Sequence, residues 1–475
     1  MKRTKIIATL GPSSSSFKII ESLVQNGVDI VRLNFSHGTL EAHAKLIQIV
    51  RRISEKIGRP IGILQDLQGP KIRIGEIRDG QIFLNDGQEI VITTEPVEGT
   101  KEIISTTYKH LPKDVSPGDS ILLDDGLIEL QVRKVVSEKV ICKIIHGGPL
   151  SSYKGVNLPG VKLSIPSLTE KDMEGLKFGI EQKVDFVALS FVRSPMDVAH
   201  IKKIIEDENT DIPVVAKLEK PEAIKNLDEI LSVTDAAMVA RGDLGVEMNP
   251  EKVPIIQKEI IRKCIEKGIP VITATQMLES MRFHPKPTRA EASDVANAIF
   301  DGTDAVMLSG ETASGAYPVE SVQMMTKIIE EAERHSQEDN RGFHRDKTHP
   351  RATFPDSISE AACDAALELN ARAIVAFTQS GFTARLLSKY RPSTPIVAFT
   401  LTNKVQRRLL LNWGVLTRKI EMINSLDEMI RRVEKALLSD DLVKPGDSVV
   451  IVSGAPLGVR GTTNMMTLHR VGRKN

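Results

Sequence analysis

The hydrophobic positions of this chain fall into short apolar runs that alternate with longer stretches in which apolar residues recur every three or four positions. The short runs have the length and composition of strands, and the longer stretches have the period of amphipathic helices. Near-continuous apolar strands that alternate with helices predict a parallel sheet covered on both faces. Eight strands are expected, at residues 5–8, 29–33, 61–66, 184–189, 213–217, 236–240, 270–274 and 304–308.

Eight strand–helix units over roughly 250 residues have the size of a closed (β/α)₈ TIM barrel, which is the fold we predict. A doubly wound open sheet is the alternative that the pattern leaves open. The expected catalytic barrel occupies residues 1–69 and 167–340. No internal repeat stands out on inspection of the sequence.

The segment between the third and fourth strands has a different pattern, in which apolar and polar residues alternate one by one. Runs such as QIFLNDGQEIVIT and SILLDDGLIELQVRKVV contain Asp-Gly pairs, which favour tight hairpin turns. We therefore expect a small β-barrel or sandwich domain over residues 70–166. Because barrel enzymes carry active-site loops after their strands, this domain could close over a ligand as a lid, or it could be a passive insertion.

The chain changes character again after the eighth unit. The polar stretch SQEDNRGFHRDKTHPRATFPD is the best candidate for a linker. Residues 355–475 then alternate between helices and strands, with strands expected in ARAIVAFT, PIVAFT and DSVVIVSG. This alternation indicates a separate α/β domain.

Composition narrows the classes of partner. Lys and Arg total 63 against 62 Asp and Glu, so the summed charge gives no general attraction to nucleic acid or to a membrane surface. Three widely spaced cysteines argue against a disulfide framework and a zinc site. No apolar stretch approaches the roughly 18 residues of a membrane span. We expect a soluble cytoplasmic protein.

Polar and charged residues gather where the eight strands end, which is the catalytic face of a parallel barrel. Lys217 and Glu219 lie two positions apart at the end of the fifth strand, so their side chains point to the same side. The others are Arg32, Asn34 and Ser36 after the second strand, Asp66 at the end of the third, Arg241, Gly242 and Asp243 after the sixth, Thr275 after the seventh, and Ser309 and Glu311 after the eighth.

These residue types suit phosphoryl chemistry. Lys217 could stabilise a developing oxyanion or a phosphoryl group, or it could be an ordinary salt-bridged lysine. Glu219 and Asp243 come from neighbouring strands and would repel each other unless a divalent ion such as Mg²⁺ lay between them. The alternative is that each carboxylate pairs with a nearby base such as Arg241 or Lys220.

Several other side chains are candidates for contacts with an anionic ligand. Arg32, Arg73 and Lys154 could bind phosphate oxygens, although each taken alone is more typical of a surface charge. Thr275 and Ser309 could relay a proton through water, although hydroxyls at strand ends more often bond to the backbone.

Seven motifs together resemble those of the pyruvate kinases, in order and in spacing. The resemblance runs from Thr4 to the final residues and implies that the phosphoryl group of phosphoenolpyruvate passes to ADP, giving pyruvate and ATP in the last step of glycolysis. It also implies a requirement for Mg²⁺, for which Mn²⁺ is an expected substitute, and assembly as a homotetramer. The motifs are VRLNFSHG, QDLQGPKIR, KGVNLPG, VVAKLEKPEA, VARGDLGVE, TATQMLESM and VMLSGETASGAYPVES.

The resemblance assigns roles by position. Lys217 is expected to stabilise phosphoryl and enolate charge, while Glu219 and Asp243 bind the Mg²⁺. The N–H groups of Gly242 and Asp243 and the Thr275 hydroxyl are expected to hold the substrate carboxylate. The remaining assignments are Arg32 for the transferred phosphate, Asn34, His37, Arg73 and Lys154 for the nucleotide phosphates, and Thr275, Ser309 and Glu311 for protonation of the enolate.

One departure from the family pattern concerns K⁺. Most well-known members bind it with residues that match Asn34, Ser36, Asp66 and the carbonyl of Leu67. They read D-T-K-G-P-E where this chain reads DLQGPK, so that an acidic residue is replaced by Lys71. A tethered ammonium can replace the charge of K⁺, and we expect activity without added K⁺. The alternative is that Lys71 is a surface residue and that the K⁺ site persists.

The carboxy-terminal domain resembles the family's regulatory domain. The run TQSGFT matches its phosphate-binding loop and supplies Thr378, Gln379, Ser380, Gly381 and Thr383 as candidate contacts for a sugar phosphate or an AMP-like effector. Phe382 stands where many members carry a basic residue. Because the sequence stops at Asn475, we expect no further carboxy-terminal domain of the kind that some bacterial members append.

Two other functions remain open from the residues alone. Another Mg²⁺-dependent barrel enzyme that acts on phosphoenolpyruvate or pyruvate would share the carboxylates and arginines but would not need ADP. A catalytically silent metabolite sensor would keep the fold and the effector loop, but we would expect it to lose Lys217, Glu219 or Asp243, and all three are present.

Overall fold

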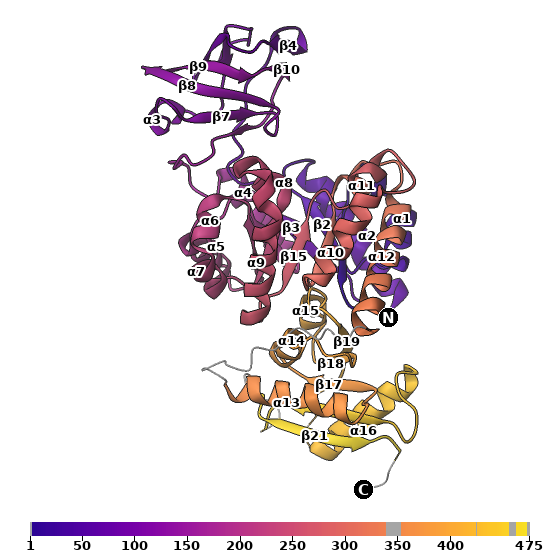
Figure 1. The fold of residues 1–475 in the computed structure, drawn as a ribbon. Coiled ribbons are helices and arrows are strands. Elements are labelled where there is room, and N and C mark those ends of the chain that lie inside the picture. The colour runs from indigo at the N-terminus through magenta and orange to yellow at the C-terminus, as the bar shows by residue number, and fades with distance from the viewer. Residues whose placement is uncertain (1, 339–352, 424, 456–461, 473–475) are drawn as a thin grey trace.

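A computed structural model describes residues 2–338, 353–423, 425–455 and 462–472. Three regions follow one another along its long axis, with a barrel in the middle, a β-rich region at one end and an α/β region at the other (Figure 1). Most of the expected linker, 336–356, lies outside the described residues.

Eight parallel strands close into a barrel, which confirms the predicted (β/α)₈ fold and rules out the open sheet. Each strand begins and ends within two residues of its predicted position. The strands are β1 (Lys5–Thr9), β2 (Ile30–Asn34), β3 (Gly62–Asp66), β12 (Phe186–Leu189), β13 (Val214–Leu218), β14 (Ala236–Ala240), β15 (Val271–Ala274) and β16 (Ala305–Leu308).

Amphipathic helices cover the outside of the barrel and bury their apolar faces in one large cluster. Capping residues determine where these helices begin and end. In α2, for example, the Thr39 hydroxyl caps the first turn, and Gly58 ends the helix in the left-handed conformation. The helices are α1 (Phe17–Gln25), α2 (Leu40–Ile57), α4 (Glu170–Glu181), α5 (Pro195–Asp207), α6 (Pro221–Lys225), α7 (Leu227–Val233), α8 (Arg241–Glu247), α9 (Val253–Lys267), α10 (Arg289–Phe300), α11 (Gly310–Ala313) and α12 (Pro318–Glu338).

The interior of the barrel is packed with apolar side chains from alternate strand positions, including Leu64, Val215 and Met238. Leu410 and Leu411 of the carboxy-terminal region belong to the same cluster, so they close the amino-terminal end of the barrel. The other end is where the polar residues lie.

Four aspartates at the amino-terminal rim make the same contact with the backbone. Each precedes an even-numbered strand of the barrel, donates its N–H to a carbonyl of the strand before it, and accepts that residue's N–H through Oδ2. The Oδ2 acceptors and their donors are Asp29 with Ile6 (3.0 Å), Asp185 with Ile63 (2.9 Å), Asp235 with Val214 (2.9 Å) and Asp304 with Val271 (2.9 Å).

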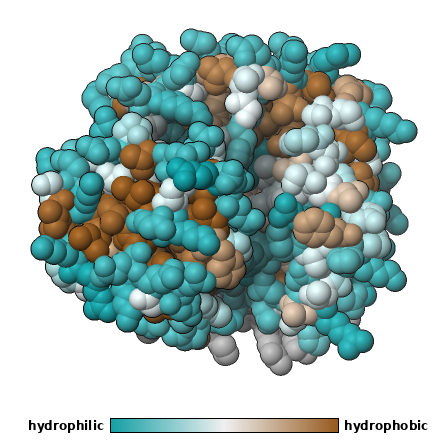
Figure 2. All heavy atoms as spheres, turned by 90° about the horizontal axis from the view of Figure 1, so that it is seen from above, coloured by the Kyte–Doolittle hydropathy of each residue, from teal (hydrophilic) through white to brown (hydrophobic). Residues whose placement is uncertain are grey.

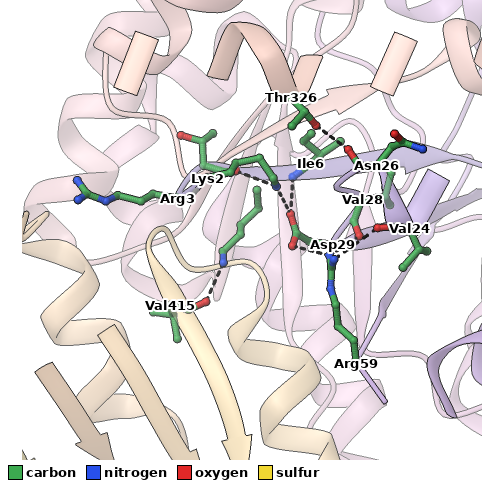
Figure 3. Close-up of polar contacts among 12 residues, drawn as sticks. Lys2, Arg3, Ile6, Val24, Asn26, Val28, Asp29, Arg59, Thr326 and Val415 are labelled. Atoms are coloured by element: carbon green, nitrogen blue, oxygen red, sulfur yellow. Dashed lines mark hydrogen bonds and ion pairs between the residues drawn. The ribbon is translucent and has the colours of Figure 1, made fainter. Parts of the chain in front are cut away.

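This contact reveals a short repeat, Val or Thr followed by Asp and two apolar residues, that inspection of the sequence missed. Each of these aspartates also pairs with at least one basic side chain. Figure 3 shows Asp29 held between Lys2, Arg59 and the N–H of Ile6. Burial alone would raise the pKa of Asp29, but Lys2, Lys5 and Arg59 together lower it to about 2.

The region inserted between β3 and α4 contains the expected alternating strands. A six-stranded sheet, ordered β11-β7-β8-β9-β5-β6, and a two-stranded sheet of β10 and β4 share one hydrophobic core. The elements are β4 (Gln81–Leu84), β5 (Glu89–Thr93), β6 (Ile103–Ser105), α3 (Leu111–Asp114), β7 (Ser120–Leu123), β8 (Ile128–Val136), β9 (Lys139–His146), β10 (Gly148–Ser151) and β11 (Val156–Asn157).

The carboxy-terminal region is a five-stranded sheet, ordered β19-β18-β17-β20-β21, with helices packed around it. The sequence predicted β17, β18 and β20 but did not single out β19, β21 or α16. The elements are α13 (Phe354–Glu368), β17 (Ala373–Phe377), α14 (Phe382–Lys389), β18 (Ile396–Thr400), α15 (Asn403–Leu409), β19 (Val415–Lys419), α16 (Leu426–Ser439), β20 (Ser448–Ser453) and β21 (Met465–Arg470).

Candidate active site

The period of two along each strand places the polar residues at the mouth of the barrel. Leu64 and Val215 point into the interior, so the residues two positions further on, Asp66 and Lys217, point the same way one layer higher. Seen from above, the molecule is hollowed beside the inserted region, which rises at the left of the view (Figure 2).

Lys217 lies at the centre of a compact polar cluster. Its Nζ donates to Ser190 Oγ at 2.7 Å and lies 3.5 Å from Asp66 Oδ1 and 3.6 Å from Glu219 Oε2. Burial disfavours the charged ammonium, but Asp66, Glu219 and Asp243 outweigh it and raise the pKa of Lys217 above its usual value. Lys217 therefore carries a fixed positive charge in a largely buried position.

Arg32 extends this cluster toward the first strand. Its Nε donates to Asp66 Oδ2 at 2.7 Å and its Nη1 to Thr9 Oγ1 at 3.0 Å. Burial opposes the ionised form of Asp66, but Lys217 and Arg32 hold its pKa below the usual range. Two cations and one buried carboxylate thus face the mouth of the barrel.

Glu219 is fully buried, and its two oxygens differ. Oε1 accepts the backbone N–H of Phe191 at 2.6 Å, whereas Oε2 has no hydrogen-bond partner. Burial, opposed by Lys217 and assisted by the charge of Asp243, raises the pKa of Glu219 to about 7. A carboxylate oxygen that is buried beside a second carboxylate and left without a donor is suited to bind a cation.

The bases that could have neutralised these carboxylates are engaged elsewhere. Lys220 pairs with Glu247 at 2.6 Å, and Arg241 pairs with Asp294 at 2.8 Å. Lys220 and Arg241 are therefore not the bases that pair with Glu219 and Asp243, and the base nearest to Glu219 Oε2 is Lys217 at 3.6 Å. Among the described residues no group of three or more His, Cys, Asp or Glu side chains forms a closed metal cage, so two carboxylates would need further oxygens from a ligand.

The loop after β15 turns sharply beside the start of α8. Thr275 and Gln276 both have positive φ, at 69° and 55°, which is a strained conformation for residues with side chains. The Thr275 hydroxyl accepts the N–H of Gly242 at 2.8 Å, and Arg241 donates to the Thr275 carbonyl at 2.7 Å. Two of the expected carboxylate-binding groups, Gly242 and Thr275, are thus brought together and bond to each other.

Glu311 holds the neighbouring loop. Its carboxylate accepts the N–H groups of Leu278 at 3.0 Å and Ser309 at 2.8 Å, and burial raises its pKa. Ser309 Oγ is buried without a hydrogen-bond partner. Of these two residues, Ser309 has the free group that a proton relay needs.

The expected nucleotide-binding residues lie where the inserted region meets the barrel. Lys154 pairs with Asp124 at 2.8 Å, and Arg73 donates to the carbonyl of Tyr153 at 2.9 Å. Burial, then the charges of Arg73 and Lys71, lower the pKa of His37, so these cations lie near one another. The cluster is basic, as a site for phosphates requires.

Two of the oxygens expected to line the monovalent-cation pocket already accept hydrogen bonds. Asn34 Oδ1 accepts the N–H of Ser36 at 3.1 Å, and the Leu67 carbonyl accepts the Ser190 hydroxyl at 2.7 Å. Lys71 is exposed at the join between barrel and inserted region, and within the described chain its ammonium has no ion-pair partner. The occupation of this pocket by Lys71 stays a prediction.

Comparison with known proteins decides the family. The profile "Pyruvate kinase, barrel domain" matches residues 1–322 and the profile "Pyruvate kinase, alpha/beta domain" matches residues 356–469. The chain belongs to the pyruvate kinase family. It is an enzyme of that family, whose substrates and products are phosphoenolpyruvate, ADP, pyruvate and ATP and whose members use a divalent metal.

The relatives support this over the full length. Pyruvate kinases of Staphylococcus epidermidis and Staphylococcus aureus are each 47% identical over 475 residues, which cover 99% of this chain and 81% of the relative. A crystal structure of a pyruvate kinase from Cryptosporidium parvum superimposes with a TM-score of 0.92 at 37% identity, over 99% of this chain and 96% of the other. No helix among the described residues is long and apolar enough to span a membrane.

The loop that resembles the pyruvate kinase effector site connects β17 with α14. Thr378 Oγ1 accepts the N–H of Gly381 at 3.0 Å, and the Thr383 hydroxyl lies 2.7 Å from that of Thr463. Gly381 has a φ of 89°, which favours glycine there. The loop has the turn geometry expected of its sequence, and its ligand stays a prediction.

Ser190 is the residue of this pyruvate kinase site that sequence reasoning missed. It links Lys217 to the Leu67 carbonyl and so positions the central ammonium. The signal was available, because Phe186 and Ala188 point into the barrel and the same period places Ser190 at its mouth.

Proposed function

We propose that this enzyme transfers the phosphoryl group of phosphoenolpyruvate to ADP at a Mg²⁺-dependent centre built on Lys217, Glu219 and Asp243. The observation that carries the proposal is the buried Glu219 Oε2, which has no hydrogen-bond partner and lies 3.6 Å from the Lys217 ammonium. An unsatisfied carboxylate beside a fixed cation suits a centre that binds a metal ion and an anionic substrate together.

The donor set fits Mg²⁺, with Mn²⁺ as a substitute. Glu219 and Asp243 would hold the ion, and substrate oxygens and water would complete its oxygen ligands. When bound, Mg²⁺ would neutralise charge that develops on the phosphoryl and enolate oxygens. Because burial keeps the pKa of Glu219 near 7 in the free chain, protons should compete with the metal below that pH.

In this proposal, cationic side chains of the enzyme hold the phosphoryl group and stabilise its charge during the transfer. Lys217 stabilises the phosphoryl group in flight and then the enolate oxygen, because its ammonium is fixed by Ser190 and Asp66. Arg32 grips the phosphate with the guanidinium nitrogens that now bond to Asp66 and Thr9. The phosphoryl group leaves the enol oxygen and bonds to the terminal phosphate oxygen of ADP.

The groups around Thr275 orient the substrate and supply the proton. We assign its carboxylate to the N–H groups of Gly242 and Asp243 and to the Thr275 hydroxyl, and this requires the ligand to displace the Gly242–Thr275 hydrogen bond. In this proposal the Ser309 hydroxyl gives its proton to the enolate carbon and takes a proton from water. Glu311 acts as a positioning residue, because its carboxylate already accepts two backbone N–H groups.

The inserted region, residues 70–166, is proposed as the lid over the barrel of residues 1–69 and 167–340. Its Arg73 and Lys154, together with Asn34 and His37 of the barrel, would bind the nucleotide phosphates. Support for a phosphate site here comes from the pKa of His37, which burial and then the charges of Arg73, Lys71, Lys171 and Arg32 lower. Closure of the lid would bring Lys154 away from Asp124 and toward the ligand.

Lys71 is proposed to make the enzyme independent of K⁺. It lies two residues after Gly69, whose φ of 69° marks the turn at the join between the two regions. Rotation at this join would carry the exposed ammonium toward the pocket of Asn34, Ser36, Asp66 and Leu67. The charge of K⁺ would then be supplied by the chain.

The remaining proposals concern assembly and control. Residues 355–475 would form the regulatory domain, with a phosphorylated effector of sugar-phosphate or AMP-like type on the loop of Thr378, Gln379, Ser380, Gly381 and Thr383. The Gly381 turn and its Thr378 hydrogen bond support a loop that is shaped for phosphate. We also propose a homotetramer in the cytoplasm.

A coupled assay of pyruvate formation tests the function and the role of Lys71 together. In buffer with a quaternary-ammonium counterion and no K⁺ or Na⁺, we expect turnover that requires both ADP and Mg²⁺ and that added K⁺ does not raise. Lys71→Glu should lose at least about tenfold in turnover and regain it with K⁺.

Lys162→Glu makes the same charge change at another exposed lysine of the inserted region and should leave turnover unaffected. Pyruvate formation without ADP would contradict the proposed function. Strong K⁺ activation of the unsubstituted enzyme would contradict only the role of Lys71.

A further inference from the structure

A second histidine lies behind the loop that carries His37. His43 is in the first turn of α2 and is 7% exposed, whereas His37 is exposed in the loop between β2 and α2. The Nε2 atom of His43 lies 3.0 Å from the backbone carbonyl oxygen of His37. The proposed catalytic centre assigns no part to His43, although it contacts a residue that we assign to the nucleotide phosphates.

The His43 ring is fixed by an aromatic stack. It lies flat on Phe35, with the ring centroids 4.2 Å apart and the ring planes 8° apart. Phe35 contacts Phe178 of α4 at a centroid distance of 5.9 Å and belongs to the main core cluster of the barrel. Because Phe35 directly follows β2, the stack ties the start of α2 to the end of that strand.

The surroundings of the His43 ring determine which nitrogen carries the hydrogen. A carbonyl oxygen can only accept a hydrogen bond, so we place the hydrogen on Nε2. Nδ1 is buried and has no hydrogen-bond partner among the described residues. Burial lowers the pKa of His43, although the bond to the His37 carbonyl opposes this change. His43 is therefore a neutral hydrogen-bond donor at neutral pH.

The orientation of the His37 peptide depends on this donor. The other hydrogen bonds at this point of the loop are local, from the His37 N–H to the Asn34 carbonyl at 3.2 Å and from the Ser36 N–H to Asn34 Oδ1 at 3.1 Å. Within the described part of the chain, the His37 carbonyl accepts no hydrogen bond other than that of the His43 ring. Rotation of this peptide would redirect the His37 side chain.

We propose that His43 is a positioning residue for the nucleotide, because it fixes the His37 peptide and so aims the His37 side chain at the phosphates. This inference rests on the proposed function, which takes His37 as a nucleotide contact. A side chain that is already in place when ADP arrives costs less entropy to order on binding. Loss of the His43 donor should therefore weaken ADP binding and leave the transfer step unchanged.

His43→Phe removes the donor while it keeps a flat ring over Phe35. Steady-state kinetics should show a rise of about fivefold in the KM for ADP, with kcat and the KM for phosphoenolpyruvate within about twofold of the unsubstituted enzyme. Calorimetric titration with ADP should show the same loss of affinity. His200→Phe makes the same change at an exposed position of α5 and should alter none of these values.

A purely structural role of His43 predicts a different result. A histidine that only packs against Phe35 would lower the unfolding temperature when it is replaced, without a change in the affinity for ADP. Unchanged KM and affinity for ADP in folded His43→Phe would therefore overturn the proposal. If His43→Phe does not fold, His43→Gln and His43→Leu give the same comparison, because glutamine keeps an N–H donor and leucine has none. Tighter ADP binding by His43→Gln would support the proposal, and equal affinities would overturn it.

The same measurements separate the role of His43 from the proposed function. ADP-dependent turnover of the unsubstituted enzyme, together with unaffected kinetics of His43→Phe, would contradict only the role of His43. Failure of ADP to bind the unsubstituted chain would contradict both.

Discussion

The two rims of the barrel both carry buried carboxylates, but the carboxyl-terminal rim leaves two carboxylate oxygens without a hydrogen bond. At the amino-terminal rim, both oxygens of each of the four aspartates accept a hydrogen bond. At the carboxyl-terminal rim, Glu219 Oε2 and Asp66 Oδ1 have no hydrogen bond and lie about the Lys217 ammonium. Buried carboxylates thus have their hydrogen bonds at one end of the barrel and lack some of them at the other, where we propose that a ligand binds.

The hydrogen-bond partners of a buried carboxylate help to distinguish a structural role from a ligand-binding role. A buried carboxylate with all its partners present adds to stability, and removal of one partner leaves an uncompensated charge. A buried carboxylate that lacks partners costs stability unless a ligand supplies them. The unsatisfied rim is the one that the family motifs occupy.

The largest effect that distinguishes the rims is expected from their lysines. Lys217→Met should lower turnover by several orders of magnitude, because it removes the ammonium that we propose stabilises the transferred charge, while substrate and metal should still bind. Steady-state kinetics with ADP and phosphoenolpyruvate measures the change.

Lys5→Met is the matched control at the opposite rim. Lys5 is also buried, has a pKa lowered by burial to about 8, and donates to the Val415 carbonyl at 2.7 Å. We expect it to lower the unfolding temperature and to spare turnover. Near-normal turnover of Lys217→Met would refute its assigned role.

The next largest effect concerns stability at the amino-terminal rim. Asp304→Asn breaks a buried pair with Arg391 and should lower the free energy of unfolding by about 3–5 kcal/mol. Asp228→Asn, which loosens an exposed pair with Lys263, should cost no more than about 1 kcal/mol. Denaturant unfolding measures both. Equal losses of unfolding free energy in Asp304→Asn and Asp228→Asn would contradict the proposed difference between the rims. A fall in the turnover of Asp304→Asn without a loss of stability would contradict it as well.

Much of the barrel could be predicted because its signal is local. The strands are short apolar runs. Because side chains two positions apart on a strand point the same way, the interior positions Leu64 and Val215 predict that Asp66 and Lys217 face the mouth of the barrel. The contacts of the amino-terminal rim could not be predicted, because Asp185 meets Arg407 and Asp304 meets Arg391 across long sequence separations. Those contacts depend on which residues the fold brings together, and the hydrophobic pattern of the sequence does not contain that information.

The candidate site was predicted unevenly for the same reason. Residue type and strand position predicted that Lys217, Glu219 and Asp243 lie close together, and the structure places their charges near one another. Ser190 was missed although it follows the same period, because a lone serine carries no charge signal. That Lys220 and Arg241 pair elsewhere, leaving Glu219 Oε2 unsatisfied, was visible only in the structure.

Burial raises the pKa of Glu219 to about 7, which predicts how the stability of the metal-free chain changes with pH. In the metal-free chain the folded state holds this proton up to a higher pH than the unfolded state does. The group therefore lowers stability as the pH rises from its ordinary value near 4.5 through about 7. A metal that binds the ionised form must displace the proton over the same range.

The most direct test of the central claim is the binding of Mn²⁺ to the free enzyme, followed by electron paramagnetic resonance between pH 5 and 8. Affinity should rise by up to about tenfold per pH unit below 7 and level off above it, and Glu219→Gln should abolish both the binding and its pH dependence. Asp29→Asn, at the satisfied rim, should change neither. Unaltered Mn²⁺ binding in Glu219→Gln would contradict the account.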